Sequence, residues 1–173
     1  DLTARIGAIT QELRSFARKS HPTVSTVSVN AAIDGALMLL GSRMRRAGVR
    51  LVRNTSIDAP ADVTVLADRF RLEQVIVNLI QNALEALEDV PNPAITLSVS
   101  RAGNLVELAV ADNGPGLSEQ VREQLFTPFV TTKANGLGLG LVISRDIIAA
   151  LDGELDLRPS DNGAHFVVTL RSA

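Results

Sequence analysis

The chain has 173 residues, of which 46% are hydrophobic and 21% are charged, and its net charge is -2. This size and composition predict one globular domain with a buried core and exclude an intrinsically disordered chain. The absence of cysteine excludes disulfides and thiolate chemistry, two histidines leave little scope for a metal centre, and no apolar run reaches the ~18 residues of a membrane span.

The first 21 residues form a separate unit in the pattern. Apolar side chains at Leu2, Ile6, Ile9, Leu13 and Phe16 are spaced 4, 3, 4, 3, as on the seam of paired helices. We expect residues 1–21 to be the end of a dimerisation helix, although an ordinary helix packed on its own domain gives the same pattern over two heptads. Since the chain begins without a start signal, we also expect it to be part of a longer protein.

The next segment alternates between strand and helix patterns. Asn30 and Asp68 are the expected N-caps of two long helices, and Gly48 lies just beyond the first of them. The arginines between residues 43 and 53 are interpreted as a solvated face, because the negative net charge argues against a nucleic-acid surface. The predicted order is a strand over 24–29, a helix over 30–47, strands over 49–54 and 62–67, and a helix over 68–89.

The second half begins and ends with hairpins. Strands over 94–101 and 105–111 are joined at Gly103-Asn104, and a second hairpin closes the chain after Gly153. Between them the pattern predicts a short helix over 118–124, a long loop, and a helix from Leu139. The fold class is therefore α+β, a two-layer sandwich with about five strands in a mixed sheet and the main helices on one face.

The helix sequence NLIQNALEAL places Asn78, Asn82 and Glu85 on one face. Asparagine is a poor helix former, so a pair spaced by four residues needs an explanation. One reading is a solvated face. The other is that amide oxygens coordinate Mg²⁺, which takes few protein ligands and completes its shell with water and phosphate.

The sequence ADNGPGL follows directly on a predicted strand. Asp112 stands at the strand end, with Gly114 and Gly116 two and four residues later. An ordinary tight turn has the same composition. The functional reading is that the Asp112 carboxylate accepts a hydrogen bond from an adenine amino group, while the glycines leave room for the ring.

Three glycines, Gly136, Gly138 and Gly140, precede the last helix. The run lacks the Gly-Lys-Ser/Thr of a P-loop and the third glycine of the dinucleotide fingerprint. What remains is a set of backbone N–H groups at a helix N-terminus, which can hold an anion. Hydroxyls and a cation lie just upstream, at Thr131, Thr132 and Lys133.

In this order, the motifs resemble the boxes of sensor histidine kinases. Asn78 and Asn82 match the N box, Asp112, Gly114 and Gly116 match G1, Phe126 and Phe129 match F, and Gly136, Gly138 and Gly140 match G2. The stretch GAHF at 163–166 resembles the last glycine box. Residues 1–21 resemble the second helix of the dimerisation hairpin, particularly of kinases that sense dicarboxylates or nitrogen status. Residues 22–173 would form the catalytic domain.

The resemblance implies a Bergerat-type fold that binds ATP and Mg²⁺ and transfers the γ-phosphoryl group to a histidine. Asn82 would hold Mg²⁺, the glycine run would present N–H groups to the triphosphate, Leu137 and Leu139 would cover the nucleotide, and Lys133 would contact the γ-phosphate. The implied partners are the phosphoacceptor helices of the same kinase, as a homodimer, and a response regulator. The implied location is cytoplasmic, without membrane insertion by this segment.

Two positions depart from common family patterns. Many histidine kinases have a lysine where this chain has Glu85, and the hydrolysing relatives have a glutamate where it has Asn78. A neutral amide cannot act as general base, so slow hydrolysis is expected. The phosphoacceptor histidine is expected upstream of Asp1, since His21 precedes a proline and His165 lies in a predicted strand. A conformational ATPase and a non-catalytic nucleotide-binding module remain as alternatives.

Overall fold

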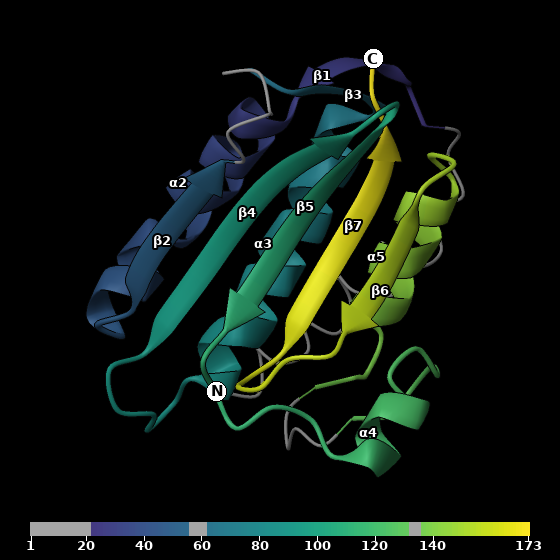
Figure 1. Cartoon of the computed structure of the whole chain (residues 1–173). Helices are drawn as coiled ribbons and strands as arrows, with labels where there is room; N and C mark the ends of the chain where they lie inside the picture. The colour runs from purple at the N-terminus through teal and green to yellow at the C-terminus, as the bar shows by residue number, and fades with distance from the viewer. Residues whose placement is uncertain (1–21, 56–61, 132–135) are drawn as a thin grey trace, which may run out of the picture.

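The computed structural model describes residues 22–55, 62–131 and 136–173. Figure 1 shows two layers, with a twisted sheet in front and helices α2, α3 and α5 behind it. The elements in chain order are β1 (Ser25–Ser28), α2 (Val29–Arg46), β2 (Arg50–Thr55), β3 (Thr64–Ala67), α3 (Arg69–Ala86), β4 (Ala94–Ala102), β5 (Leu105–Asp112), α4 (Glu119–Glu123), α5 (Gly140–Ala149), β6 (Glu154–Arg158) and β7 (His165–Arg171).

The main sheet has five strands in the order β2-β4-β5-β7-β6. Only the β2–β4 pair is parallel, and the other three pairs are antiparallel. The predicted mixed sheet with helices on one face is confirmed. Strands β1 and β3 pair with each other in a separate two-stranded ribbon, which the alternation of apolar residues did not predict.

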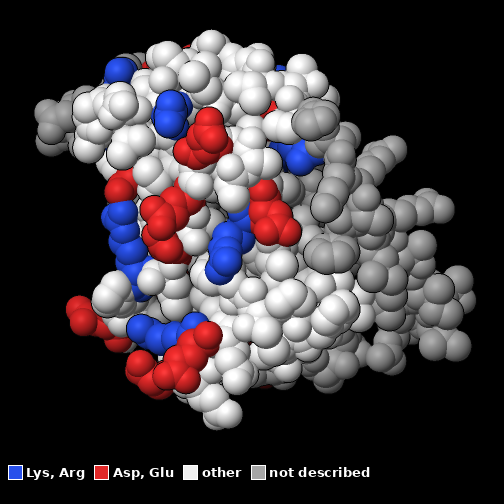
Figure 2. All heavy atoms as spheres, turned by 90° about the vertical axis from the view of Figure 1, so that its right-hand side faces the viewer, with Lys and Arg blue, Asp and Glu red and all other residues white. Residues whose placement is uncertain are grey.

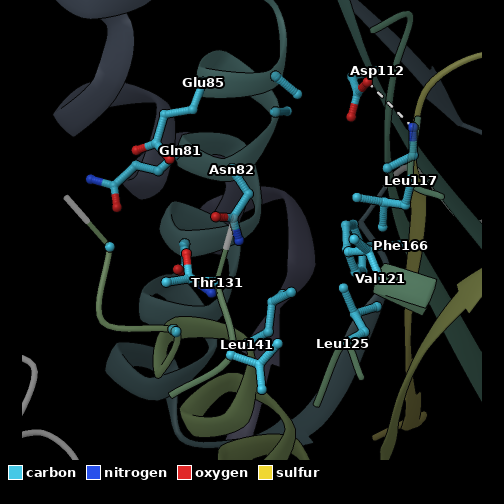
Figure 3. Close-up of a pocket in the computed structure, with 18 of the residues that line it drawn as sticks. Gln81, Asn82, Glu85, Asp112, Leu117, Val121, Leu125, Thr131, Leu141 and Phe166 are labelled. Atoms are coloured by element: carbon cyan, nitrogen blue, oxygen red, sulfur yellow. Dashed lines mark hydrogen bonds between the residues drawn. The ribbon is translucent and has the colours of Figure 1, made fainter. Parts of the chain in front are cut away.

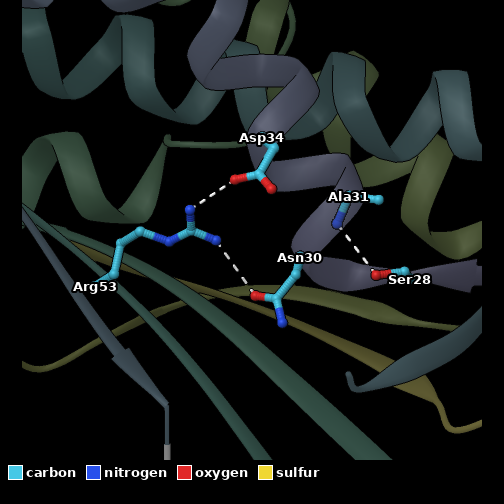
Figure 4. A network of polar contacts seen from close by, with 5 residues as sticks. All are labelled: Ser28, Asn30, Ala31, Asp34 and Arg53. Atoms are coloured by element: carbon cyan, nitrogen blue, oxygen red, sulfur yellow. Dashed lines mark hydrogen bonds and ion pairs between the residues drawn. The ribbon is translucent and has the colours of Figure 1, made fainter. Parts of the chain in front are cut away.

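Helix α2 begins one residue earlier than predicted, and Asn30 is not its N-cap. Ser28 takes that position, because its Oγ accepts a hydrogen bond from the Ala31 N–H at 3.2 Å. Asn30 lies instead in the first turn, where its side chain accepts from Arg53 of β2 at 3.3 Å. Arg53 also pairs with Asp34 at 2.6 Å, as Figure 4 shows, so this arginine ties α2 to the edge of the sheet.

Helix α3 is the central helix of the domain. Asp68 caps it as predicted, by accepting from the Arg71 N–H at 3.2 Å. It ends at Ala86 and not at Asp89, which has a left-handed backbone in the following turn. The predicted core stripe of Leu72, Ile76, Leu79, Ala83 and Leu87 is buried. Burial of this stripe fixes the opposite face of α3, which carries the two asparagines.

Strand β6 is an edge strand of the main sheet. Its exposed positions, Glu154, Asp156 and Arg158, are all charged, and charged side chains hinder pairing with another chain. Figure 2 shows this side of the molecule, where acidic and basic side chains are interspersed. Arg158 reaches across to Glu107 at 2.9 Å, and this contact lowers the pKa of Glu107 and raises that of Arg158. Within the described residues, no helix is long and apolar enough to cross a membrane.

Candidate nucleotide-binding site

A cavity of about 1010 Å³ lies at the end of the sheet near α4, beside the C-terminal half of α3. Most of its walls come from four parts of the chain that are far apart in sequence, and Arg43 of α2 and residues 130–131 add to them. The four parts are the polar face of α3, the turn after β5 with α4, the segment around Gly136–Leu141, and the start of β7. Among the site residues predicted from sequence, the cavity is lined by Asn78, Asn82, Glu85, Asp112, Gly116, Thr131, Gly136, Leu137, Gly138 and Gly140.

The cavity has two chemically different walls, which Figure 3 shows facing each other. On one side Gln81, Asn82 and Glu85 project from α3, with Thr131 below them. On the other side lie the apolar side chains of Leu117, Val121, Leu125 and Phe166. Such a cavity suits a ligand with a flat apolar part and a polar or charged tail.

Asp112 is the last residue of β5 and is one of two buried polar side chains among the described residues, with 8% of its surface exposed. Its Oδ1 accepts hydrogen bonds from the backbone N–H groups of Gly114 at 2.9 Å and Ala164 at 3.3 Å. Figure 3 shows the other carboxylate oxygen pointing into the cavity. Burial raises the pKa of Asp112, and the two backbone hydrogen bonds oppose that rise.

Two glycines, Gly114 and Gly163, lie closely against Asp112. Gly114 does not line the cavity; a Cβ there would lie 2.9 Å from Asp112 Oδ1 and 3.0 Å from the Ala86 carbonyl oxygen. Gly163 has a φ of +69°, and a Cβ there would overlap the backbone carbonyl of Asp112. The chain from 163 to 164 therefore packs directly on the aspartate that ends β5. Only the likeness of GAHF to a glycine box marked Gly163 in the sequence.

Asn78 joins α3 to the start of α5. Its side-chain Nδ2 donates to Ser144 Oγ at 2.9 Å, and Ser144 is only 2% exposed. A Cβ on Gly140 would lie 2.5 Å from Asn78 Oδ1, so the two helices meet closely where the glycine run ends. The amide thus has a structural role at the base of the glycine run in addition to its place in the cavity wall. Ser144 carried no sequence signal beyond its place in a helix.

Replacing Ser144 by alanine tests this contact. Ser144→Ala leaves the partly buried amide nitrogen of Asn78 without its acceptor, so the free energy of unfolding should fall by about 1–2 kcal/mol. Urea unfolding measures this change in the free energy of unfolding. Ser42→Ala, at an exposed position of α2, is the matched control and should change stability by less than about 0.5 kcal/mol. Equal stabilities for the two variants would show that the Asn78–Ser144 hydrogen bond contributes nothing.

The glycine run occupies the position expected before the last helix, with one correction. Leu139 was expected to cover the nucleotide, but its side chain is fully buried in the core and does not line the cavity. Leu139 is the N-cap residue of α5, and its stripe with Ile143, Ile147 and Leu151 is buried as predicted. Leu137 does line the cavity, as does Leu141. Thr132 and Lys133 lie outside the described residues.

Four of the five arginines between residues 43 and 53 are exposed, as expected for a solvated face, and Arg43 is partly buried. Arg53 binds α2, whereas Arg43 lines the cavity and pairs with Glu85 at 3.7 Å. Phe126, which matches the F box, also contacts an arginine. The Arg145 guanidinium of α5 lies 5.0 Å from the centre of its ring, within the range of a cation–π interaction. Phe129 is 66% exposed and has a left-handed backbone.

The geometry agrees with the comparison with known proteins. Residues 67–173 match the family described as histidine kinase-, DNA gyrase B- and HSP90-like ATPases. The chain belongs to this family. It is the catalytic ATP-binding domain of a sensor histidine kinase, as the sequence motifs predicted.

A curated relative and two solved structures support this assignment. The C4-dicarboxylate transport sensor protein DctB of Rhizobium meliloti (strain 1021) is 46% identical over the whole of this chain, which spans 27% of that protein. The nucleotide-free catalytic domain of histidine kinase ThkA has a TM-score of 0.77 and 32% identity, covering 86% of this chain and 95% of that one. ThkA in its complex with the response regulator TrrA has a TM-score of 0.80 and 26% identity, and the match covers 99% of this chain and 48% of that one.

Proposed function

We propose that this domain, within a longer kinase, transfers the γ-phosphoryl group of Mg·ATP to a histidine outside residues 1–173. The observation that carries the proposal is the Asp112 carboxylate at the cavity floor. Two backbone N–H groups fix one of its oxygens, and the other points into a cavity with an apolar wall. A carboxylate held in this way can accept from the exocyclic amino group of adenine, while the purine ring packs on Leu117 and Phe166.

The donor set fits a magnesium ion carried in by the nucleotide. Among the described residues no group of three His, Asp, Glu or Cys side chains could hold a metal by itself, whereas Asn82 offers an amide oxygen on the polar wall. Mg²⁺ characteristically uses one or two protein ligands together with substrate phosphates. Asn82 would hold the ion, with Asn78 and Gln81 beside it. When bound, Mg²⁺ neutralises charge on the phosphate oxygens during in-line transfer.

Transfer to a histidine is favoured over hydrolysis by the chemistry of Asn78. Its amide nitrogen donates to Ser144, and a neutral amide cannot take a proton from water. Gly136, Gly138 and Gly140 would present backbone N–H groups to the triphosphate at the start of α5, with Thr131 on the cavity wall and Thr132 and Lys133 beside them. Lys133 would contact the γ-phosphate and Leu137 would cover the nucleotide.

The rest of the pathway is inferred from the relatives. The chain spans about a quarter of the curated relative. From their heptad spacing, residues 1–21 are proposed to end the dimerisation hairpin of a homodimeric kinase. A response regulator is the proposed receiver of the phosphoryl group, because the similar kinase ThkA was solved with its regulator TrrA. The proposed location is the cytoplasmic end of a membrane-anchored sensor.

A trans-phosphorylation experiment tests the function. The chain is mixed with labelled Mg·ATP and a separate dimerisation hairpin from a DctB-type kinase, and acid-labile, base-stable label on the hairpin is followed. We expect transfer to the hairpin and very slow release of inorganic phosphate without it. Rapid hydrolysis without the hairpin would favour the conformational ATPase. Nucleotide binding with neither reaction would favour a non-catalytic regulatory module.

A further inference from the structure

We propose that Arg43 of α2 is a phosphate-binding residue of this site, which it enters by leaving its ion pair with Glu85. The inference rests on the proposed binding of ATP in the cavity and adds a residue from a helix outside the sequence motifs. The juxtaposition that carries it is the Arg43 guanidinium and the Glu85 carboxylate, 3.7 Å apart on the polar wall.

The charge of the described cavity lining favours such a residue. The described lining includes three carboxylates, Glu85, Glu88 and Asp112, and Arg43 is the only lysine or arginine among those lining residues. A nucleoside triphosphate brings three to four further negative charges, of which Mg²⁺ compensates two. A cation on this wall, in addition to the Lys133 proposed for the γ-phosphate, offsets repulsion between the polyphosphate and these acidic side chains. In a partly enclosed space that repulsion is screened less than in bulk water.

The position of Arg43 suits it to this role. It lies in the last turn of α2, and Glu85 stands one helical turn beyond Asn82 on α3. In Figure 3, Glu85 lies on the side of Gln81, Asn82 and Thr131, opposite the apolar wall that would hold the purine, and the guanidinium of Arg43 pairs with this carboxylate. A guanidinium offers paired N–H donors that match phosphate oxygens, so it favours the tail of the ligand over the base.

The ion pair itself can be exchanged for a ligand at little cost. The side chains of Arg43 and Glu85 are 42% and 36% exposed, and exposed pairs of this kind add little to stability. A polyphosphate offers Arg43 more negative charge than one carboxylate does. Glu85 therefore holds the guanidinium at the rim in the free protein and competes with phosphate for it.

Binding measurements on the 173-residue chain test the inference. Calorimetry is carried out with Mg·ATP and with adenosine for wild type, Arg43→Gln and the charge exchange Arg43→Glu with Glu85→Arg. Arg43→Gln should weaken Mg·ATP binding about tenfold and change adenosine binding less than about twofold. The exchange restores a cation to the same wall and should recover most of the lost affinity for Mg·ATP. Arg46→Gln, in the same turn of α2 and outside the cavity lining, is the matched control and should bind like wild type.

The possible failures are distinguishable. If the folded wild type binds neither ligand, the proposed function is wrong and the inference falls with it. If wild type binds Mg·ATP and Arg43→Gln binds it equally well, only the inference is overturned. Equal losses for ATP and adenosine would also overturn it, because Arg43 would then act on the base or on the fold. Thermal unfolding of each variant separates loss of structure from loss of a phosphate contact.

Discussion

Asp112→Asn should strongly weaken nucleotide binding without lowering the stability of the fold. The Asn Oδ1 can still accept from the N–H groups of Gly114 and Ala164, so the turn is retained. The second atom of the side chain becomes an N–H donor that faces the adenine amino group, which is also a donor. Loss of a charged acceptor combined with this mismatch should weaken binding at least about a hundredfold, as measured by calorimetry with Mg·ATP.

The same substitution should also change how the free energy of unfolding depends on pH. Because burial raises the pKa of Asp112 above its unfolded value, the folded state binds its proton more tightly than the unfolded chain does. Stability from this group is therefore greatest below the unfolded pKa and is lost as the pH rises through the folded one. Removing the charge should leave the free energy of unfolding at pH 7 equal to or above that of wild type. The gain should shrink as the pH falls from the raised folded pKa toward the ordinary aspartate pKa, and it should vanish below the ordinary value.

An exposed aspartate gives the control. Asp156→Asn removes one charge from edge strand β6 and should change neither nucleotide affinity nor stability appreciably. Wild-type affinity should itself decline as acid protonates Asp112, at a higher pH than an ordinary aspartate would require. If Asp112→Asn bound Mg·ATP like wild type, the adenine contact assigned to this carboxylate would be wrong. If it unfolded, the carboxylate would be needed for the turn.

Gly163→Ala should lower the free energy of unfolding substantially, although it adds only one methyl group. The residue has a left-handed backbone, and its new Cβ would overlap the carbonyl oxygen of Asp112 and lie 2.6 Å from Asp112 Oδ1. The backbone strain costs about 1–2 kcal/mol and the overpacking about 1–3 kcal/mol, so the free energy of unfolding should fall by about 2–5 kcal/mol. Since relief of the overlap must move Asp112, nucleotide affinity should fall as well in the molecules that remain folded.

Gly103→Ala separates these two causes. Gly103 has a φ of +63°, close to that of Gly163, but a Cβ there would meet no atom within 4 Å. Its cost should therefore be the backbone strain alone, about 1–2 kcal/mol, with no effect on binding. Urea unfolding of both variants measures the difference. Equal costs would mean that the chain at 163 yields without disturbing Asp112.

Sequence patterns predicted features that depend on neighbours along the chain. The Asp68 cap, the turn at Gly103-Asn104 and the buried stripe of α3 each follow from residues within one or two turns of each other. The order of the motifs then predicted that Asp112 and the asparagine face of α3 belong to one site, and both line the same cavity. The cap of α2 was predicted wrongly, because Ser28 takes the place expected for Asn30.

Features that depend on tertiary packing were missed. Arg43 reaches the cavity only because α2 packs beside α3. In the sequence it is one of several neighbouring arginines, and nothing distinguishes it from the others. Leu139 has the same neighbours in sequence as Leu137, yet the first turn of α5 directs it into the core. The contact of Gly163 with Asp112 joins residues far apart in the chain. No local pattern specifies such pairs.

The last residues of the chain have a practical consequence. The N–H of Ala173 donates to the Thr64 carbonyl at 3.1 Å, and Figure 1 shows this terminus at the far end of the sheet from α4. A fluorescent dye or an immobilising tag joined after Ala173 would sit well away from where ligands enter. Anisotropy and surface-based titrations can thus be run on the labelled chain with its entrance unobstructed.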